Sequence, residues 1–378
     1  MKRLLQLTIF LFVYQVKMSG QTDSLKNKLI FNGDFRFRVE QDWATTDQFG
    51  FPLEDKTRLR FRFRSGMEYT LKNNLYFGAG IRTGYTQNPQ DPQITFGDKG
   101  LEFGNLPIGL EKLYAGFNTK HISGWIGKNS FPFERQNELF WSDNVFPSGI
   151  FLSSRWQLKN GVLNDLNLHA AHFIYSSSGT LFDEQSIDGV QLVSRFFNSK
   201  FSFFPGLYYF HKLPSIPESN LTNQLNYLIT HVGAKITLFT QPSIHLEFDY
   251  YQNMTSLTKY DFVSDDFKNE KTGFVGGIIF GESKLKGDWA FKIYYVSLEK
   301  YAAVDYLAQN DWARWSYSDQ NSPAGRLTNF RGYEAMVGYM IAENLSTKVR
   351  FFHTEQIVKT GTVNEKSYRI RLDLDFAF

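Results

Sequence analysis

The sequence predicts an all-β fold, a transmembrane antiparallel up-and-down β-barrel of about sixteen strands. Three observations support this prediction. Apolar and polar residues alternate with period two from about residue 29 onward, the connections between the alternating segments are short and long in turn, and aromatic residues make up 17% of the chain. Phe and Tyr, at 38 and 20 residues, exceed their share in an average globular protein, and aromatic girdles border the apolar band of a membrane barrel.

The first twenty residues have the pattern of an export signal. Lys2 and Arg3 precede an apolar run over residues 4–13, and two small residues end the segment. The run is too short to cross a membrane as a helix, and no run of about 18 apolar residues follows it, which excludes a helical membrane protein. We therefore expect a signal peptide over residues 1–20 and an outer-membrane barrel domain over residues 21–378.

The final segment shows the strand pattern most regularly, because helical spacing would scatter its apolar residues around a cylinder. One face carries Tyr368, Ile370, Leu372, Leu374, Phe376 and Phe378, and the other carries Arg369, Arg371, Asp373 and Asp375. Segments 31–39 and 58–67 alternate in the same way. Further strands are expected near 74–86, 109–118, 121–128, 149–158, 164–175, 188–198, 200–210, 224–238, 242–253, 270–281, 286–299, 327–340 and 344–357.

The connections between these segments alternate in length. Short turns are expected at 72–74, 118–120, 159–161, 198–199, 240–241, 282–283 and 343–344, and long polar loops near 42–55, 87–108, 129–148, 176–187, 211–223, 254–269, 300–326 and 358–364. A bacterial barrel divides its short periplasmic turns from its long extracellular loops in this way, which would place both chain ends in the periplasm. A soluble sandwich would also alternate, but it seldom shows such asymmetry in loop length.

Two parts of the sequence resemble known outer-membrane proteins. The last strand, with Tyr368, Phe376 and the terminal Phe378, resembles the signal that the barrel assembly machinery recognises. The segments 127–133 (GKNSFPF), 138–144 (ELFWSDN) and 147–149 (PSG) are similar to the putative porin family of Gram-negative, Bacteroidetes-like outer membranes, although Ser142 stands where that family has an aspartate after the tryptophan. The resemblance implies a diffusion channel and names no solute.

Arginines on the inward faces of neighbouring strands are the candidate pore wall. Strand pairing should bring them to similar heights, whereas Asp34, Asp373 and Asp375 should lie lower, near the periplasmic mouth. One interpretation is an anion-favouring wall of guanidinium groups. The other is a ladder that neutralises itself with Asp34, Glu40 and Glu68. The predicted wall comprises Arg36, Arg38, Arg60, Arg62, Arg64, Arg82, Arg369 and Arg371.

The third long loop combines acids with many aromatic residues, which would be costly on a wet surface. We expect it to fold into the lumen, as the family resemblance implies, and to set Glu134, Glu138 and Asp143 opposite the arginines as a constriction. The alternative is contact with other loops or with neighbouring protomers.

Enzymatic and metal-binding functions have little support in the sequence. The seven histidines show no HExxH spacing, and His169 and His172 should point to opposite faces of one strand. There are no cysteines, so thiolate metal sites and disulfides are excluded. We expect no cofactor, no metal and no catalytic residue.

The sequence therefore predicts an ion-transporting porin for passive diffusion of small hydrophilic solutes, anions being favoured. Its expected partners are outer-membrane lipid and lipopolysaccharide, the barrel assembly machinery and two further copies of the chain in a homotrimer. A net charge of +3 gives no reason to expect nucleic acid. The rival function is a non-channel adhesin or carbohydrate-binding scaffold, for which loop 300–326, with Tyr301, Tyr306, Trp312, Trp315 and Tyr317, would be the binding surface.

Overall fold

The computed structural model describes most of the barrel domain. The described residues are 28–71, 74–86, 89–98, 104–158, 161–177, 184–215, 223–312 and 327–378. The predicted signal peptide over residues 1–20 lies outside them.

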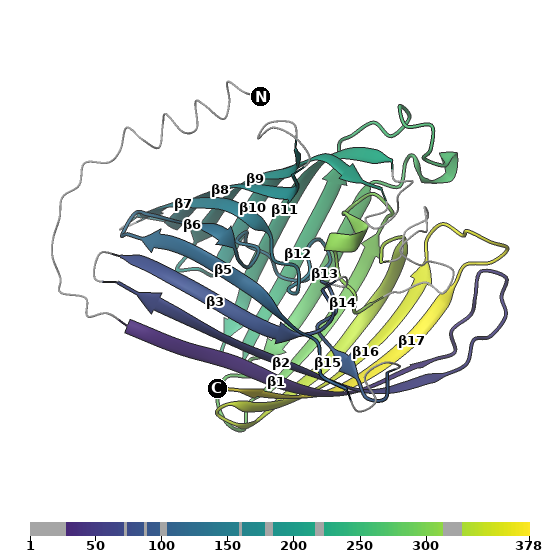
Figure 1. Cartoon of the computed structure of the whole chain (residues 1–378), viewed down its shortest axis with the longest axis horizontal. Helices are drawn as coiled ribbons and strands as arrows, with labels where there is room; N and C mark the ends of the chain where they lie inside the picture. Colours follow the sequence, from purple (N-terminus) through teal and green to yellow (C-terminus); the bar gives the residue numbers. More distant parts are fainter. Residues whose placement is uncertain are drawn as a thin grey trace.

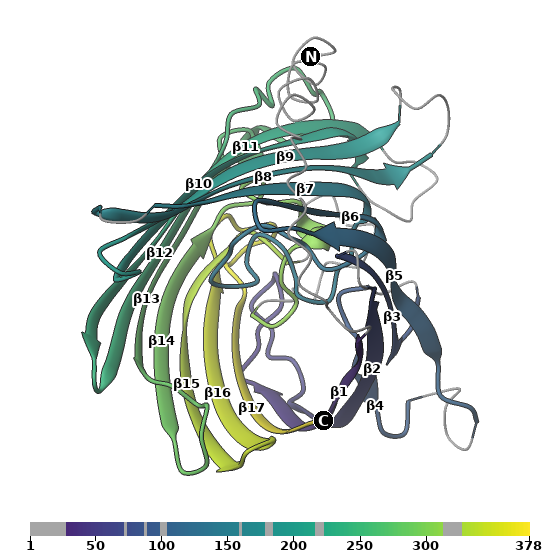
Figure 2. The ribbon, with the colours of Figure 1, turned by 90° about the vertical axis from the view of Figure 1, so that its left-hand side faces the viewer.

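The described residues form a closed antiparallel barrel of sixteen strands (Figures 1 and 2), as the sequence predicts. A seventeenth, two-residue strand, β4, comes from the second long loop and pairs with β2. The strands are β1 (Lys28–Trp43), β2 (Lys56–Thr70), β3 (Leu75–Thr83), β4 (Ile94–Thr95), β5 (Ile108–Asn118), β6 (Ile122–Lys128), β7 (Ser148–Gln157), β8 (Leu163–Ser176), β9 (Gln185–Phe196), β10 (Phe201–Pro214), β11 (Gln224–Thr240), β12 (Ser243–Asn253), β13 (Thr272–Gly281), β14 (Trp289–Leu298), β15 (Phe330–Ala342), β16 (Leu345–Gln356) and β17 (Lys366–Ala377).

The barrel closes where the last strand pairs with the first. β17 runs antiparallel to β1, with Trp43 opposite Tyr368 at one end and Asp34 opposite Ala377 at the other. The terminal residue continues this ladder, because Gly33 and Phe378 exchange backbone hydrogen bonds of 2.9 and 3.0 Å. Closure leaves no free edge, which is what a β-structure surrounded by lipid requires.

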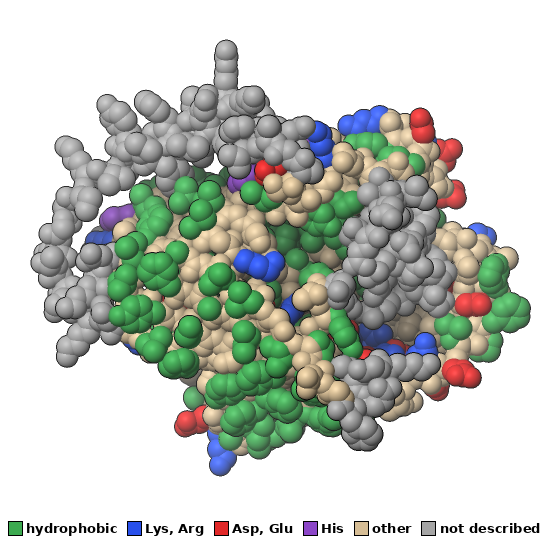
Figure 3. Space-filling model, in the orientation of Figure 1, with side chains coloured by type: hydrophobic (Ala, Val, Ile, Leu, Met, Phe, Trp, Pro, Cys, Tyr) green, Lys and Arg blue, Asp and Glu red, His purple; other side chains and the backbone are tan. Residues whose placement is uncertain are grey.

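The two faces of the wall have opposite character. On β17 the residues from Ile370 to Phe376 at even positions are exposed and apolar, whereas Arg369, Arg371 and Asp373 are buried inside the barrel. Figure 3 shows hydrophobic side chains gathered on the outer surface of the strands nearest the viewer. An apolar exterior around a charged interior inverts the arrangement of a soluble protein and matches a lipid-facing wall.

The two short helices of the described chain are single 3-10 turns, η1 (Asp265–Phe267) and η2 (Asp305–Leu307). Among the described residues, no helix has the length and apolarity to cross a membrane.

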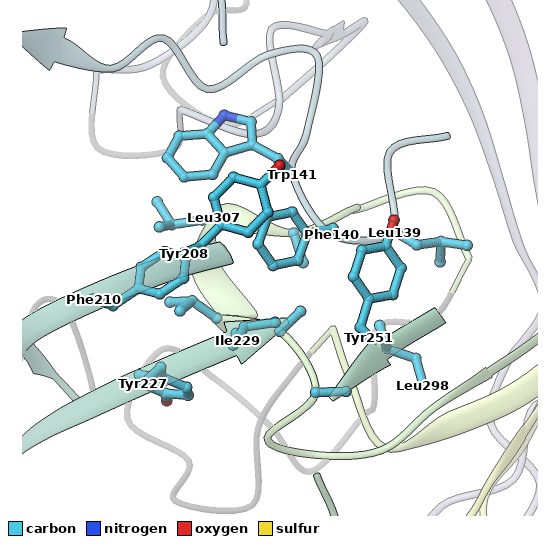
Figure 4. Close-up of a cluster of buried hydrophobic side chains, with 14 of the residues drawn as sticks. Leu139, Phe140, Trp141, Tyr208, Phe210, Tyr227, Ile229, Tyr251, Leu298 and Leu307 are labelled. Carbon is cyan, nitrogen blue, oxygen red and sulfur yellow. The ribbon is translucent and has the colours of Figure 1, made fainter. Parts of the chain in front are cut away.

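The main hydrophobic core lies inside the barrel, and two loops build it. The third long loop, L3 (residues 129–147), packs Phe140 and Trp141 against inward residues of β10–β12, including Tyr208 and Tyr251 (Figure 4). The seventh long loop, L7 (299–329, described to 312 and from 327), adds a buried segment over 301–308. These loops therefore fill the side of the lumen along β6–β13, and Figure 2 shows them within the ring of strands.

Candidate functional site: the charged wall of the lumen

The predicted arginines lie on four adjacent strands. Those of β1, β2 and β3 are in cross-strand register with one another, whereas Arg369 and Arg371 of β17 are opposite Asp42 and Glu40 of β1 rather than opposite arginines. Arg38 of β1 is opposite Arg60 of β2, and Arg64 of β2 is opposite Arg82 of β3. Each of them points inward because strand residues alternate between the two faces. The full set is Arg36 and Arg38 on β1, Arg60, Arg62 and Arg64 on β2, Arg82 on β3, and Arg369 and Arg371 on β17.

The aspartates expected below the arginines lie level with them instead, and Asp34 is opposite Arg64. Asp373 is opposite Arg38 and accepts two hydrogen bonds from it, of 2.5 and 2.8 Å. Asp375 is opposite Arg36 and accepts bonds of 2.5 and 3.2 Å. The prediction of a separate acidic exit from these two residues was wrong, because antiparallel register aligns each acid with an arginine rather than below it.

Two of the three acids expected to neutralise the arginines do contact them. Asp34 accepts a hydrogen bond of 3.0 Å from Arg62, and Glu40 accepts hydrogen bonds from arginines of β2 and β17. Glu68 contacts no arginine in the described structure; it accepts a hydrogen bond of 3.0 Å from the hydroxyl of Tyr114. The wall is thus a partly compensated ladder rather than a bare row of cations.

L3 reaches across the lumen to this wall. Arg82 donates to the backbone carbonyl of Asn144 at 2.9 Å, and Arg64 donates to the side-chain oxygen of the same residue. Arg64 and Arg82 otherwise have Glu111 of β5 at 3.8 Å as their nearest acid. These two arginines therefore hold the loop in place as well as contributing positive charge.

The three acids predicted for L3 have different surroundings. Glu138 and Asp143 line the same cavity as the arginines. Burial, and then the neighbouring carboxylate of Asp143, raise the pKa of Glu138 above its ordinary value. Glu134 is absent from that lining and pairs with Arg195 of β9 at 3.1 Å, so the structure does not place it opposite the arginines.

The second long loop, L2 (residues 84–107, described in part), connects the two other loops to the wall. The backbone oxygen of Gln90 accepts hydrogen bonds from Asn144 of L3 and Asn310 of L7, at 2.9 and 2.7 Å. Asp91 pairs with Arg60 at 2.6 Å. This contact could not be predicted, since L2 shows no apolar pattern that would indicate its docking inside the barrel.

Sequence reasoning also missed Arg350 and Asp311. Arg350 of β16 is directly opposite Arg371 of β17, so extending the predicted register by one strand would have found it. Asp311, near the end of the first described part of L7, bridges Arg350 and Arg371 at 2.7 and 2.5 Å. Burial would raise the pKa of Asp311, but the guanidinium groups of Arg371 and Arg350 outweigh it and hold that pKa well below its ordinary value.

A cavity of about 360 Å³ lies between the wall and the loops. Its lining contains nine Lys or Arg side chains and five Asp or Glu side chains, among the residues that the structure describes. The basic ones come from β1, β2, β14, β16 and β17, and the acidic ones are Asp91, Glu138, Asp143, Asp311 and Asp373. Four of these five acids are carried by loops. Further acids of the strands, among them Asp34 and Glu40, pair with the same arginines from outside this lining.

Comparison with known proteins identifies the architecture. No protein-family model matches the sequence, and no curated protein matches it. Among solved structures, the high-pH structure of Pseudomonas putida OprB is similar at 12% identity and a TM-score of 0.56, covering 93% of this chain and 94% of that one. The barrel has the fold of porins.

Two other solved structures agree. Salmonella typhi OmpF in complex with daunomycin matches at 12% identity with a TM-score of 0.54, covering 96% of this chain and all of its own. A triple mutant of the Rhodopseudomonas blastica porin matches at 12% identity with a TM-score of 0.51, covering 92% of this chain and all of its own. At this identity the likeness concerns the porin fold and not the solute.

The residues proposed from the sequence as an assembly signal lie on the outer face of the porin-like barrel. Phe376 and Phe378 are exposed, and Tyr368 packs against Trp43 and His353. Their role in assembly stays a prediction.

In the described part of L7, the aromatic residues expected to bind a partner or a sugar do not form an exposed surface. Tyr301 and Trp312 are buried, and Tyr306 packs against Tyr175 of β8. Trp315 and Tyr317 lie outside the described residues. In the described part of the chain, no group of three potential metal ligands lies together.

Proposed function

We propose that this protein is an outer-membrane porin through which small hydrophilic solutes, anions above all, diffuse passively. One observation carries the proposal: the cavity between wall and loops is lined by nine basic and five acidic side chains, inside a closed barrel with an apolar exterior. Excess positive charge on low-dielectric walls raises the local concentration of anions. The protein would act as a channel and not as an enzyme.

The constriction of this channel would lie between L3 and the strands β1, β2, β16 and β17. Glu138 and Asp143 would form its acidic edge, with Arg36, Arg38, Arg60, Arg62 and Arg371 on the opposite side; these groups line one cavity. Arg64 and Arg82 support the same geometry by holding Asn144. L2 and L7 would narrow the passage further through Asp91 and Asp311.

The remaining expectations follow from the outer-membrane location. The short turns and both chain ends would face the periplasm, and the long loops the outside. The same proposal includes a signal peptide over residues 1–20 and membership in the putative porin family. It also includes contact with lipid and lipopolysaccharide, delivery by the barrel assembly machinery and assembly as a homotrimer.

Planar-bilayer recording of the purified, folded protein tests the proposal. We expect stepwise, voltage-independent conductance increments in KCl, because a lined cavity inside a closed barrel provides a water-filled path. Absence of conductance steps from protein that is shown to be folded would refute the porin function and favour a non-channel scaffold.

A further inference from the structure

Arg350 and Arg371 form one of several cross-strand arginine pairs on the barrel wall. They are direct cross-strand partners on β16 and β17, and two like charges placed opposite each other destabilise a sheet unless an anion lies between them. Both guanidinium groups also lie over the ring of Phe352, at 4.8 and 5.5 Å from its centroid. The pair is therefore held in a fixed orientation by the wall itself.

Each arginine divides its donors between the wall and the lumen. Nε of Arg350 donates to Glu334 at 2.7 Å, and Nε of Arg371 donates to Glu40. Nη1 of Arg350 donates a hydrogen bond of 2.7 Å to one carboxylate oxygen of Asp311, and Nη1 of Arg371 makes an ion-pair contact of 2.5 Å with the other oxygen. This geometry is a two-arginine clamp for one carboxylate group.

The present occupant of the clamp comes from a loop and not from the wall. Asp311 belongs to L7, and its side chain keeps 17% of its surface exposed. Asp311 and Arg350 line two cavities, of about 300 and 360 Å³, and Arg371 lines the larger of them. Cavities of this size accommodate small organic ligands, so a solute in the lumen can reach the same Nη donors.

We propose that Arg350 and Arg371 form a binding site for the carboxylate group of a permeating solute, and that Asp311 occupies this site as an internal competitor. A solute carboxylate replaces the Asp311 carboxylate, ion for ion, without leaving either arginine unpaired. The role of this exchange in transport rests on the proposed channel function, but the binding itself does not.

Isothermal titration calorimetry with succinate, on the full chain folded in detergent, tests the site. We expect Asp311→Asn to lower the dissociation constant about tenfold, which corresponds to about 1.4 kcal/mol, because the competing charge is gone. The matched control is Asp265→Asn, which neutralises another loop aspartate, paired with Lys268 at 2.5 Å and remote from both cavities; it should stay within about twofold of the unmodified chain.

A second variant separates a clamp from a general electrostatic effect. Arg350→Lys in the Asp311→Asn background keeps the positive charge beside Glu334 but removes the forked guanidinium. If the two guanidinium groups bind the carboxylate directly, the double variant should lose most of the succinate affinity gained in Asp311→Asn. If only the general electrostatic field matters, the double variant should keep that gain. Heat-modifiable electrophoretic mobility would confirm that each variant is folded.

Three results would overturn the proposal. An unchanged dissociation constant for succinate in Asp311→Asn would show that Asp311 only holds L7 in place and does not compete with the solute. If the double variant kept the full gain in succinate affinity, the gain would result from the change in net charge and not from the forked guanidinium groups. Tighter binding of inorganic phosphate than of succinate, at equal ionic strength, would show that the site takes a different class of anion. Because calorimetry needs no conduction, these results are distinct from a failure of the porin function in bilayers.

Discussion

Arg38 and Asp373 show how a single charge is accommodated in the wall of this barrel. Both side chains are almost fully buried, and two hydrogen bonds join them. Breaking a buried ion pair leaves the partner as an uncompensated charge, which costs roughly 3–5 kcal/mol. An exposed pair such as Arg331 and Glu355, at 3.4 Å, contributes roughly 0–1 kcal/mol because water screens it.

The two pairs make a matched stability test. We expect Arg38→Ala to lower the free energy of unfolding by about 3 kcal/mol or more, and Arg331→Ala by about 1 kcal/mol or less. Reversible guanidinium unfolding in lipid, followed by tryptophan fluorescence, would measure both. Equal losses in the two variants would show that burial does not set the strength of these pairs.

At the scale of elements, L3 is fixed to the far wall by one carboxylate. Asp249 of β12 accepts hydrogen bonds from Gln136 and Asn137 of L3, at 3.1 and 2.7 Å, and pairs with His231 of β11 at 2.8 Å. The ring of Phe140 stacks on Tyr251 at 5.1 Å, and Tyr251 stacks in turn on His231 at 4.6 Å. L3 therefore has polar anchors at β12, at the arginine wall and at β9, where Gln191 exchanges hydrogen bonds of 2.7 and 2.9 Å with the backbone of Glu134.

Removing the polar anchor should loosen L3 without opening the barrel. In Asp249→Ala, L3 loses hydrogen bonds to a charged group worth roughly 1.5–3 kcal/mol each, so we expect a larger and noisier single-channel current in planar bilayers. The control is Asp188→Ala, which removes a carboxylate from a similar pair with His172 at 2.8 Å that has no contact with L3 in the described structure. A quiet, unchanged current in Asp249→Ala would contradict the role of L3 as the constriction.

At the scale of the whole molecule, the barrel strands could be predicted because period-two alternation is a local property of the chain. Each expected segment is a strand, and the ends differ by a few residues, as where 286–299 becomes Trp289–Leu298. The pairing of β17 with β1 and of β1 with β2 also followed from the sequence, since closure of an even-numbered barrel fixes which strands meet. The register of β17 did not, because it sets Arg369 and Arg371 opposite Asp42 and Glu40 rather than level with Arg36 and Arg38.

The inside of the barrel could be predicted only in part. The aromatic content of L3 indicated docking, but the positions of Asp91 and Asp311 depend on contacts among three loops that no periodic pattern encodes. For the same reason Glu134 was placed on the acidic edge although its partner is Arg195. The ion pairs of Asp373 and Asp375 depend on the register of β1 and β17, which aligns acids with arginines rather than arginines with one another.

The central claim, an anion-favouring channel, is tested most directly by the reversal potential in a KCl gradient. The unmodified protein should give a reversal potential of the sign set by chloride. A variant in which Arg60, Arg62 and Arg64 are all replaced by Ala should have a reversal potential shifted toward that of potassium, because three positive charges leave the wall. Repeating the measurement with phosphate and sugar acids would rank the permeant anions. A cation-favouring potential in the unmodified protein, or the same potential in both proteins, would contradict the claim.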